Sequence, residues 1–237
     1  MKIGILGYGK MGRAIEALAL QRGHEIGVCI DNPQQWAERE EALATCDVAV
    51  DFSQPDSAVD NIRRCFALNV PVVVGTTGWH DQLPTLISQC QAGNHALFVA
   101  SNFSVGMNIM FALNQRLAEL MNAHPEYEVS LTETHHIHKL DAPSGTAITL
   151  ANDAIARLDR KQRWALDSPD ADTLSIHAIR QGEVPGTHTL SYHCPHDTIT
   201  LSHEAHSRQG FVLGAVLACE YMVGKRGFHT MSHLLGQ

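Results

Sequence analysis

The sequence lacks an apolar run of the about 20 residues that are needed to cross a bilayer. It also lacks an excess of basic residues, because 17 Lys and Arg stand against 25 Asp and Glu and give a formal charge of -8. Such a chain offers no extended basic surface for a nucleic-acid backbone. A strand-like segment begins at once, without the features of a secretory signal. We therefore expect a cytoplasmic protein that binds neither membranes nor nucleic acids.

Cysteine is sparse and shows no pattern. None of the 6 cysteines belongs to a CxxC pair, and most lie in apolar segments: Cys29, Cys46, Cys65, Cys90, Cys194 and Cys219. Scattered cysteines in apolar surroundings are typical of buried free thiols. We expect buried thiols here rather than disulfides or metal ligands.

The first hundred residues alternate short apolar runs with helix-like segments. Strands are expected near residues 2–7, 25–31, 47–53, 70–77 and 96–101. One amphipathic segment between them, DSAVDNIRRCFAL, begins with Pro55 and Asp56, which favour a helix start. This alternation is typical of an α/β protein with a doubly wound parallel sheet of the Rossmann type. In such sheets the carboxyl ends of the strands line a ligand crevice.

The pattern changes after Gly106. A helix is expected over MNIMFALNQRLAELM, with Met110, Leu113, Leu117 and Leu120 as a stripe that faces the core. Polar strands follow near residues 126–135, 173–182, 187–194 and 197–207. Alternating polarity and tight turns predict a smaller α+β domain with a mixed or antiparallel sheet.

Two details of this second half complete the organisation. Histidines at alternate positions of the polar strands, namely His188, His193, His196, His203 and His206, are expected to be surface or packing residues. The apolar helix and short tail after residue 207 could cap either domain on pattern alone.

A dinucleotide site is indicated by GILGYGKMGRAI, in which Gly7, Gly9 and Gly12 form GxGxxG between a strand and a helix. The first glycine permits the tight turn, the second lets the backbone approach a pyrophosphate, and the third lets helix and strand pack closely. The pyrophosphate then lies over free N–H groups at the positive end of the helix.

The second predicted strand ends in Asp31, about 20 residues beyond the glycine turn, where a carboxylate binds the adenosine ribose. Asp31 is followed by Asn32 rather than Arg, so nothing adjacent neutralises a 2′-phosphate and NADH should be preferred. Lys10, inside the turn, leaves use of NADPH open. The segments GTTG from Gly75 and ASNFS from Ala100 should lie beside the crevice, either as contacts to the nicotinamide end or as plain loops.

Residues 133–147, ETHHIHKLDAPSGTA, gather three histidines, a lysine and two carboxylates. A zinc site would use His135, His136 and His138, but neighbours in an extended segment point to opposite faces. Neither an HExxH pattern nor a cysteine accompanies them, so we expect no bound metal.

The same stretch fits an anion site better than a solvated loop. The run PSGT at residues 143–146 is typical of a helix start whose N–H groups and hydroxyls receive an anion, and Lys139 adds a positive charge there. The substrate is therefore expected to carry carboxylates. His135 can donate a proton near neutral pH, which a reduced carbon skeleton requires once hydride has arrived.

This stretch closely resembles the signature of the 4-hydroxy-tetrahydrodipicolinate (dihydrodipicolinate) reductases, enzymes of lysine and diaminopimelate synthesis. The matching residues are Glu133, His135, His136, Lys139, Asp141, Pro143, Ser144, Gly145 and Thr146. Further blocks resemble the family in the same order: GYGKMGR, DFSQPDS, PVVVGTTG, SNFSVGMN, RQGEVPGTHT and HEAHSRQGF. The resemblance implies reduction of 4-hydroxy-tetrahydrodipicolinate to tetrahydrodipicolinate by hydride transfer from NAD(P)H.

The resemblance also implies roles for individual residues. His135 would be the proton donor and acceptor, Lys139 the second catalytic group, and the substrate's carboxylates would be held by His136, Ser144, Gly145 and Thr146. The implied cofactor contacts are Gly7, Tyr8, Gly9, Lys10, Met11, Gly12, Asp31, Gly75, Thr76, Thr77, Ala100, Ser101, Asn102 and Phe103. It implies a homotetramer, with residues 1–106 and 208–237 as the dinucleotide-binding domain and 107–207 as the substrate-binding and tetramerisation domain.

The sequence departs from the family pattern in two places. The segment between Asp31 and Asp47 is short, and the basic residue that commonly follows the ribose acid is absent, which puts only the adenosine pocket and the cofactor preference in doubt. Two alternative functions stay open: an NAD-dependent dehydrogenase of an aspartate-type amino acid, and a sensor that binds NADH without catalysis.

Overall fold

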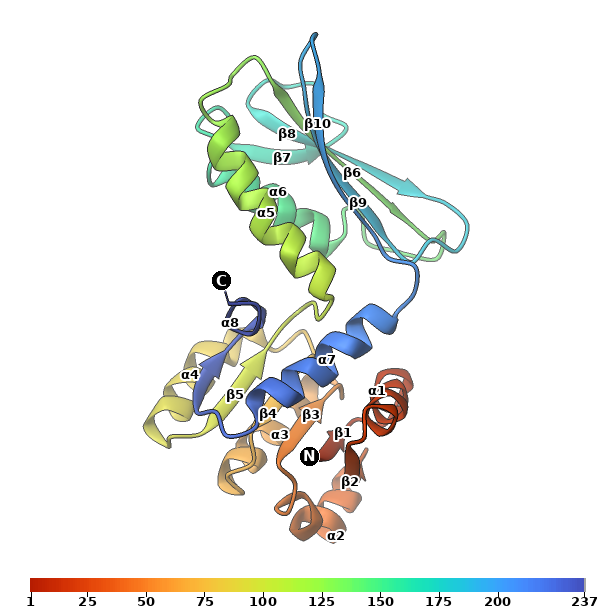
Figure 1. Ribbon diagram of the computed structural model, residues 1–237, viewed down its shortest axis with the longest axis vertical. Helices are drawn as coiled ribbons and strands as arrows, with labels where there is room; N and C mark the ends of the chain where they lie inside the picture. Colours follow the sequence, from red (N-terminus) through yellow and green to blue (C-terminus); the bar gives the residue numbers. More distant parts are fainter. Residues whose placement is uncertain (237) are drawn as a thin grey trace. The chain divides into compact units, whose positions relative to one another are not determined.

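The computed structural model describes residues 1–236 and consists of two compact units. Unit 1 contains Met1–Val105 and the chain from Gln209 onward, and unit 2 contains Gly106–Arg208 (Figure 1). Within residues 1–236, no helix is both long and apolar enough to span a membrane. The two units confirm the predicted fold class, a doubly wound α/β sheet accompanied by a smaller α+β part with a mixed sheet.

Unit 1 is built on a six-stranded sheet in the order β11-β5-β4-β3-β1-β2, in which every neighbouring pair is parallel. The strands are β1 (Lys2–Leu6), β2 (Glu25–Ile30), β3 (Val48–Asp51), β4 (Val72–Val74), β5 (Ala96–Val99) and β11 (Gly227–His229). β3, β4 and β5 are buried along their whole length, as expected of parallel strands covered on both faces.

Helices cover both faces of this sheet (Figure 1). On one face lie α1 (Lys10–Gln21), α7 (Gln209–Met222) and α8 (Met231–Leu234), which share a core with the strands. On the other face lie α2 (Pro33–Leu43), α3 (Pro55–Ala67) and α4 (Leu83–Ala92), which follows the short helix η1 (His80–Gln82). The C-terminal helix α7 therefore completes the unit that the N-terminus begins.

The short segment after Asp31 contains one helix and no further strand. In the common dinucleotide-binding order 3-2-1-4-5-6, one more strand lies beyond the second. Here the chain passes from β2 through α2 directly to β3, which pairs with β1 on its other side. In this structure β2 is therefore an edge strand, and within residues 1–236 no further strand lies beside it.

Unit 2 is built on a mixed five-stranded sheet in the order β10-β9-β6-β8-β7. Its elements are α5 (Val105–Met121), β6 (Glu128–His135), α6 (Gly145–Ile155), β7 (Arg163–Leu166), β8 (Thr173–Arg180), β9 (Thr187–His193) and β10 (Thr198–Glu204). β6 pairs antiparallel with β9 and parallel with β8. Helices α5 and α6 pack on one face of the sheet and share its core.

The predicted core stripe of α5 is wrong in part. Leu113 and Leu120 are 52% and 53% exposed, although Met110 is buried as expected. The buried face consists of Met107, Met110, Asn114, Ala118 and Met121. Asn114 donates to the carbonyl of Leu150 on α6, and its small neighbour Ala118 lets α6 approach closely. The contact with α6 therefore determines which face of α5 is buried, and the spacing of its leucines does not.

Two short strands, β7 and β11, were not expected from the sequence. Each has three or four residues and lies at the edge of its sheet. Such strands exist because a neighbouring strand accepts their backbone hydrogen bonds, and periodicity over so few residues gives no signal.

The alternation along β6 positions the candidate site of unit 2. Val129, Leu131, Glu133 and His135 are all buried on the face that α5 and α6 cover, while the residues between them are partly exposed. The buried face of β6 thus changes from apolar to ionisable toward its carboxyl end. The His-Lys segment begins directly after this point.

Candidate active site

The glycine turn of unit 1 has the backbone that a pyrophosphate site needs. Gly7 has a φ of +87°, a conformation that disfavours other residues. A Cβ on Gly12 would lie 2.2 Å from the carbonyl oxygen of Gly7, so only glycine lets α1 pack on β1. A Cβ on Gly9 would meet no atom within 4 Å, so the space over the start of α1 is open. The turn at Gly7 and the close packing at Gly12 are as their spacing predicts, and the approach of a pyrophosphate to Gly9 stays a prediction.

Asp31 is tied to this turn. Its Oδ1 accepts a hydrogen bond from the backbone N–H of Tyr8 at 2.6 Å, which fixes the carboxylate at the end of β2. Asn32 caps α2 by accepting from the N–H of Gln35. Only Oδ1 of the Asp31 carboxylate accepts the bond from Tyr8, and Lys10 is exposed at the first position of α1.

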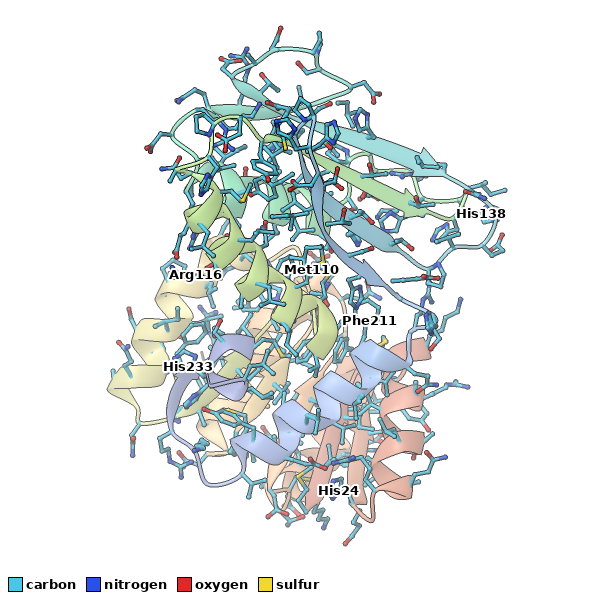
Figure 2. All side chains as sticks on the ribbon, turned by 45° about the horizontal axis from the view of Figure 1, so that its top comes forward. His24, Met110, Arg116, His138, Phe211 and His233 are labelled. Atoms are coloured by element: carbon cyan, nitrogen blue, oxygen red, sulfur yellow. The ribbon has the colours of Figure 1, made fainter. Side chains whose placement is uncertain are left out.

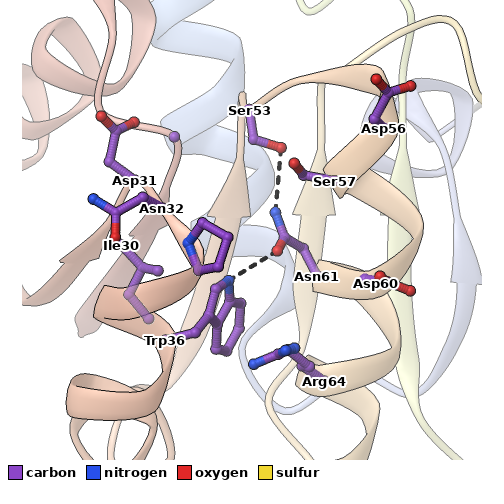
Figure 3. A pocket seen from close by; sticks show the side chains of 12 residues that line it. Ile30, Asp31, Asn32, Trp36, Ser53, Asp56, Ser57, Asp60, Asn61 and Arg64 are labelled. Carbon is purple, nitrogen blue, oxygen red and sulfur yellow. Dashed lines mark hydrogen bonds between the residues drawn. The ribbon is translucent and has the colours of Figure 1, made fainter.

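A cavity of about 280 Å³ opens beside Asp31 and is lined by α2, α3 and the loop after β3 (Figure 3). Its floor is the ring of Trp36, whose Nε1 donates to Asn61 at 3.0 Å. The Arg64 guanidinium lies 4.9 Å from the centre of the same ring. Asp56 and Asp60 line the wall that α3 contributes. This volume is near the lower limit of small-molecule pockets and suits one nucleoside.

A buried carboxylate supports the cavity from below. Asp51, at the end of β3, is fully buried and accepts hydrogen bonds from Asn61 Nδ2 at 2.7 Å, Thr76 Oγ1 at 2.6 Å and Ser53 Oγ at 2.8 Å. Burial raises the pKa of Asp51, and these hydrogen bonds oppose the rise. The carboxylate joins the cavity floor to the loop that follows β4.

The residues predicted near the nicotinamide end all follow the carboxyl ends of β4 and β5, namely Gly75, Thr76, Thr77, Ala100, Ser101, Asn102 and Phe103. Thr76 is buried, with its hydroxyl on Asp51 and its carbonyl accepting from Trp79 Nε1. Phe103 is buried against Phe52 and Phe98. The side chains of Thr76 and Phe103 thus belong to the protein's own packing and are not free to contact a ligand.

Unit 2 contains a separate cluster of ionisable groups around Glu133. This residue is fully buried, and its Oε2 lies 3.4 Å from Nδ1 of His135 and 3.8 Å from Nε2 of His188. Both oxygens accept from the backbone N–H of Ser144 at 3.1 Å, and Oε1 also binds Arg180 Nη2 at 3.1 Å. Four groups from separate segments therefore converge on one carboxylate.

Glu133, His135 and His188 place one donor atom each within 4.8 Å of one another, which is compact enough for a metal ion. These are not the three histidines considered from the sequence. His138 lies in an exposed turn beyond β6, where it meets Glu183 (Figure 2). The Glu133 oxygens already accept hydrogen bonds from Ser144 and Arg180, so this donor set fits hydrogen bonding better than metal ligation.

The imidazole of His135 is buried beneath charged neighbours. Burial lowers its pKa, the negative charge of Glu133 opposes that effect, and the positive charges of Lys139 and Arg180 lower the pKa further. Asp141 has a smaller raising effect. The net effect of these neighbours and of burial is to lower the pKa of His135.

Lys139 is a partly exposed cation of the cluster, like Arg180. Its Nζ binds both oxygens of Asp141 at 2.8 Å, and the Asp141 side chain is itself 59% exposed. The backbone carbonyl of Asp141 accepts from Arg180 at 2.6 Å, which ties the loop to β8. An incoming carboxylate can therefore exchange with Asp141 at the ammonium group.

The start of α6 completes the anion site. The Ser144 side chain accepts from the N–H of Ala147 and caps the helix, so its hydroxyl is already engaged. The first-turn amides of Gly145 and Thr146 have no intrahelical acceptor. A Cβ on Gly145 would meet no atom within 4 Å, so the space in front of these amides is open. His136 is partly exposed and lies just after β6.

Three residues of the cluster were missed or left without a role by the sequence. His188 was expected only as a surface or packing residue, and the structure shows the packing alternative: it is 5% exposed, bonds Ser144 Oγ at 3.2 Å and packs edge-on against His135. Arg180 and Glu133 lie in sequence blocks that resemble the family, but the sequence analysis assigned no role to either residue. The buried alternation of β6 was the one available signal for Glu133.

Comparisons with known proteins agree across the whole chain. The family descriptions "Dihydrodipicolinate reductase, N-terminus" and "Dihydrodipicolinate reductase, C-terminus" match residues 1–103 and 106–235. A 4-hydroxy-tetrahydrodipicolinate reductase of Christiangramia forsetii is 45% identical over 99% of this chain and 98% of the relative. One of Akkermansia muciniphila is 36% identical over 96% and 94%. The dipicolinate-bound dihydrodipicolinate reductase of Paenisporosarcina sp. TG-14 has the same fold, with a TM-score of 0.78, 21% identity and 97% of both chains covered.

The buried His188 should make stability depend on pH. Burial, followed by the nearby His135, lowers its pKa to about 4, whereas the unfolded chain takes up a proton near pH 6.5. The unfolded state thus binds more protons, and the free energy of unfolding should fall between pH 6.5 and 4 by about 3 kcal/mol from this group. Denaturant titrations at pH 7 and 4.5 measure the fall. His188→Asn should show a smaller one, and an equal fall would contradict the assignment.

Proposed function

Since the chain belongs to the dihydrodipicolinate reductase family, we propose that it reduces 4-hydroxy-tetrahydrodipicolinate to tetrahydrodipicolinate with NADH as the preferred hydride donor. The protein is an NAD(P)H-dependent reductase of lysine and diaminopimelate biosynthesis. The observation that carries the residue assignments is the buried imidazole of His135 between a carboxylate and two cations. A partly exposed lysine and an open helix start lie in the same segment.

The residues of unit 1 fit a nicotinamide dinucleotide. The open space over Gly9 receives the pyrophosphate, and the free oxygen of Asp31 receives a ribose hydroxyl. The adenine fits the cavity above Trp36. The loops after β4 and β5 hold the nicotinamide end through their backbone groups. When bound, the nucleotide supplies the hydride.

The charges around the nucleoside cavity favour NADH. Three carboxylates, those of Asp31, Asp56 and Asp60, line it, and they repel a 2′-phosphate. Arg64 is the cation that lines the same cavity, and its guanidinium is stacked on Trp36. One stacked cation offsets only part of this negative charge.

The cationic end of unit 2 binds the dicarboxylate. The amides of Gly145 and Thr146 and the side chain of His136 hold one carboxylate, with the positive end of α6 behind them. Lys139 exchanges Asp141 for the substrate and offsets its negative charge, which makes the ring a better hydride acceptor. Ser144 acts through its cap of α6 rather than by direct contact.

His135 supplies the proton. Loss of the 4-hydroxyl group as water, before or after binding, leaves a conjugated ring. After hydride reaches C4 of this ring, electron density moves toward C3, and a proton must be added there. The imidazolium of His135 donates it and becomes neutral, which its burial among cations favours. Solvent then restores the proton.

We also propose that the protein acts in the cytoplasm as a homotetramer. One face of the unit 2 sheet carries alternating polar side chains and, in residues 1–236, no helix covers it (Figure 1). A polar sheet face of this kind suits contact with the same face of another copy.

A single assay separates the reductase from the two other functions considered. The freshly made condensation product of pyruvate and aspartate semialdehyde should cause rapid NADH oxidation. An aspartate-type dehydrogenase would instead oxidise NADH only with oxaloacetate and ammonia. A sensor would not oxidise NADH with either of these substrates. Turnover confined to oxaloacetate and ammonia, or absent with both, would reject the proposed reaction.

In that assay His135→Ala should lower kcat by roughly 10²- to 10⁴-fold, the usual contribution of a positioned acid. NADH binding, followed by fluorescence, should persist, because the nucleotide residues belong to unit 1. The matched control is His138→Ala, since His138 lies three residues away and its side chain is 68% exposed. A near-normal kcat for His135→Ala would reject its role.

The cofactor preference can be tested at Asp31. The wild-type enzyme should show a lower KM for NADH than for NADPH, and Asp31→Ser should shift the ratio of the two KM values toward NADPH by about 10-fold. Asp81→Asn, an exposed carboxylate in η1, controls for a general loss of negative charge. A much lower wild-type KM for NADPH would overturn the assignment.

A further inference from the structure

Glu133 stands out in unit 2 because it is fully buried and has no place in the proton and hydride steps described above. It lies two residues before His135 on β6, so both side chains point to the face that the helices cover. The partner strand β9 places His188 directly opposite Glu133. The parallel strand β8 places Arg180 opposite His135.

Every contact of the Glu133 carboxylate is with a donor or a cation. Ser144 N–H donates to both oxygens, Arg180 donates to Oε1, and the His135 and His188 rings face Oε2. An ionised carboxylate is the form that can accept from all of them. The negative charge is therefore held in place by three separate segments of the chain.

The Nδ1 atom of His135 is the polar group without a hydrogen bond in this cluster. It is buried, and within residues 1–236 no acceptor meets it in hydrogen-bond geometry. Glu133 Oε2, at 3.4 Å, is an acceptor that can reach it. Catalytic hydrogen bonds are often long in ligand-free structures and tighten when substrate binds.

We propose that Glu133 is a positioning residue of the reductase reaction: its carboxylate holds Nδ1 of His135, so that Nε2 carries the proton for the substrate. The proposal rests on the proposed function and adds a residue to it. In the step itself the Nε2–H bond breaks, the C3–H bond forms, and the ring becomes neutral with its remaining proton on Nδ1. Glu133 stays ionised throughout, and solvent returns the proton to Nε2.

The charges that face His135 make this carboxylate necessary. Lys139 and Arg180 disfavour a proton on the ring, and so does its burial. Two carboxylates, Glu133 and Asp141, favour the protonated ring of His135. Asp141 is exposed and paired with Lys139. If substrate displaces Asp141 from Lys139, Glu133 remains as the buried anion beside the imidazolium.

The same carboxylate also fixes the anion site. Because Ser144 N–H binds Glu133, the start of α6 is held at a set distance from β6, and its next two amides face outward. The proton donor and the carboxylate receptor are thus positioned by one group. This arrangement resembles the way in which a buried carboxylate orients histidine in hydrolytic triads.

The test is Glu133→Gln, which keeps the size and one acceptor oxygen but removes the charge. It should lower kcat/KM by roughly 10- to 10³-fold. It should also move the alkaline limb of the kcat/KM profile to lower pH, since protonated His135 loses its anionic neighbour. Glu133→Asp, which keeps the charge, should restore part of the rate and return the limb toward its wild-type position. NADH affinity should stay within about 2-fold in both variants.

The matched control is Glu126→Gln. Glu126 contacts His124 with the same two-residue spacing and an Oε1 to Nδ1 distance of 3.3 Å, but both side chains are more than half exposed. Its profile should equal that of the wild type. Nitrogen NMR of the wild-type enzyme gives a readout that needs no variant: the neutral His135 ring should carry its proton on Nδ1.

Three results would overturn the proposal: a normal rate and limb in Glu133→Gln, a lowered rate with an unmoved limb, or a wild-type neutral His135 protonated on Nε2. The first result with an inactive His135→Ala would leave the proposed reaction intact. An active His135→Ala would instead remove the proposed reaction itself.

Discussion

The burial of the Glu133 charge constrains the rest of unit 2. A carboxylate removed from water is strongly destabilising unless donors surround it, and the donors here come from β8, from β9 and from the start of α6. The register of β6 with its two neighbours supplies them. A slip of one residue would turn Arg180 or His188 to the opposite face of the sheet. The strand register that surrounds Glu133 with donors therefore also brings the residues of the candidate active site together.

Unit 1 uses a related device with different partners. Asp51 ends a buried parallel strand, as Glu133 lies near the end of β6, but its donors are the neutral groups of Ser53, Asn61 and Thr76. Neutral donors suffice to order the loops of a nucleotide site, whereas the unit 2 cluster has cations that also act on a histidine. This difference agrees with the proposed roles, in which the unit 1 residues hold a ligand and the unit 2 residues also move a proton.

The sequence predicted the parts of the fold whose signals are local. Short local patterns of sequence were enough to predict five parallel strands, the glycine turn and the position of Asp31 after β2. The His-Lys segment was found because its composition is unusual and a helix start follows it. The resemblance to a family extended these signals to individual residues, and the matches over the whole chain confirmed the family.

The parts that the sequence left open or placed wrongly depend on distant partners. Alternating polarity along its strand left open whether His188 lies at the surface or packs inside, and its pairing with β6 shows that it is buried. On α5 both the leucine face and the methionine face have helical spacing. Contact with α6 selected the face with Asn114 and Ala118, because small groups allow the helices to approach. Pairing and helix contact are tertiary choices that no window of sequence contains.

The two sites also explain how a chain of net charge -8 can be suited to an anionic substrate. Exposed charges separated by more than about 10 Å are largely screened at physiological salt, so local groups decide what each site attracts. Asp31, Asp56 and Asp60 make the nucleoside cavity negative, while Lys139 and the start of α6 make the other site positive. These residues lie in separate units, so the charges proposed to select the nucleotide can change without altering those proposed to bind the dicarboxylate. The proposed cofactor preference can therefore vary independently of the proposed proton donor, His135, which Glu133 contacts from inside unit 2.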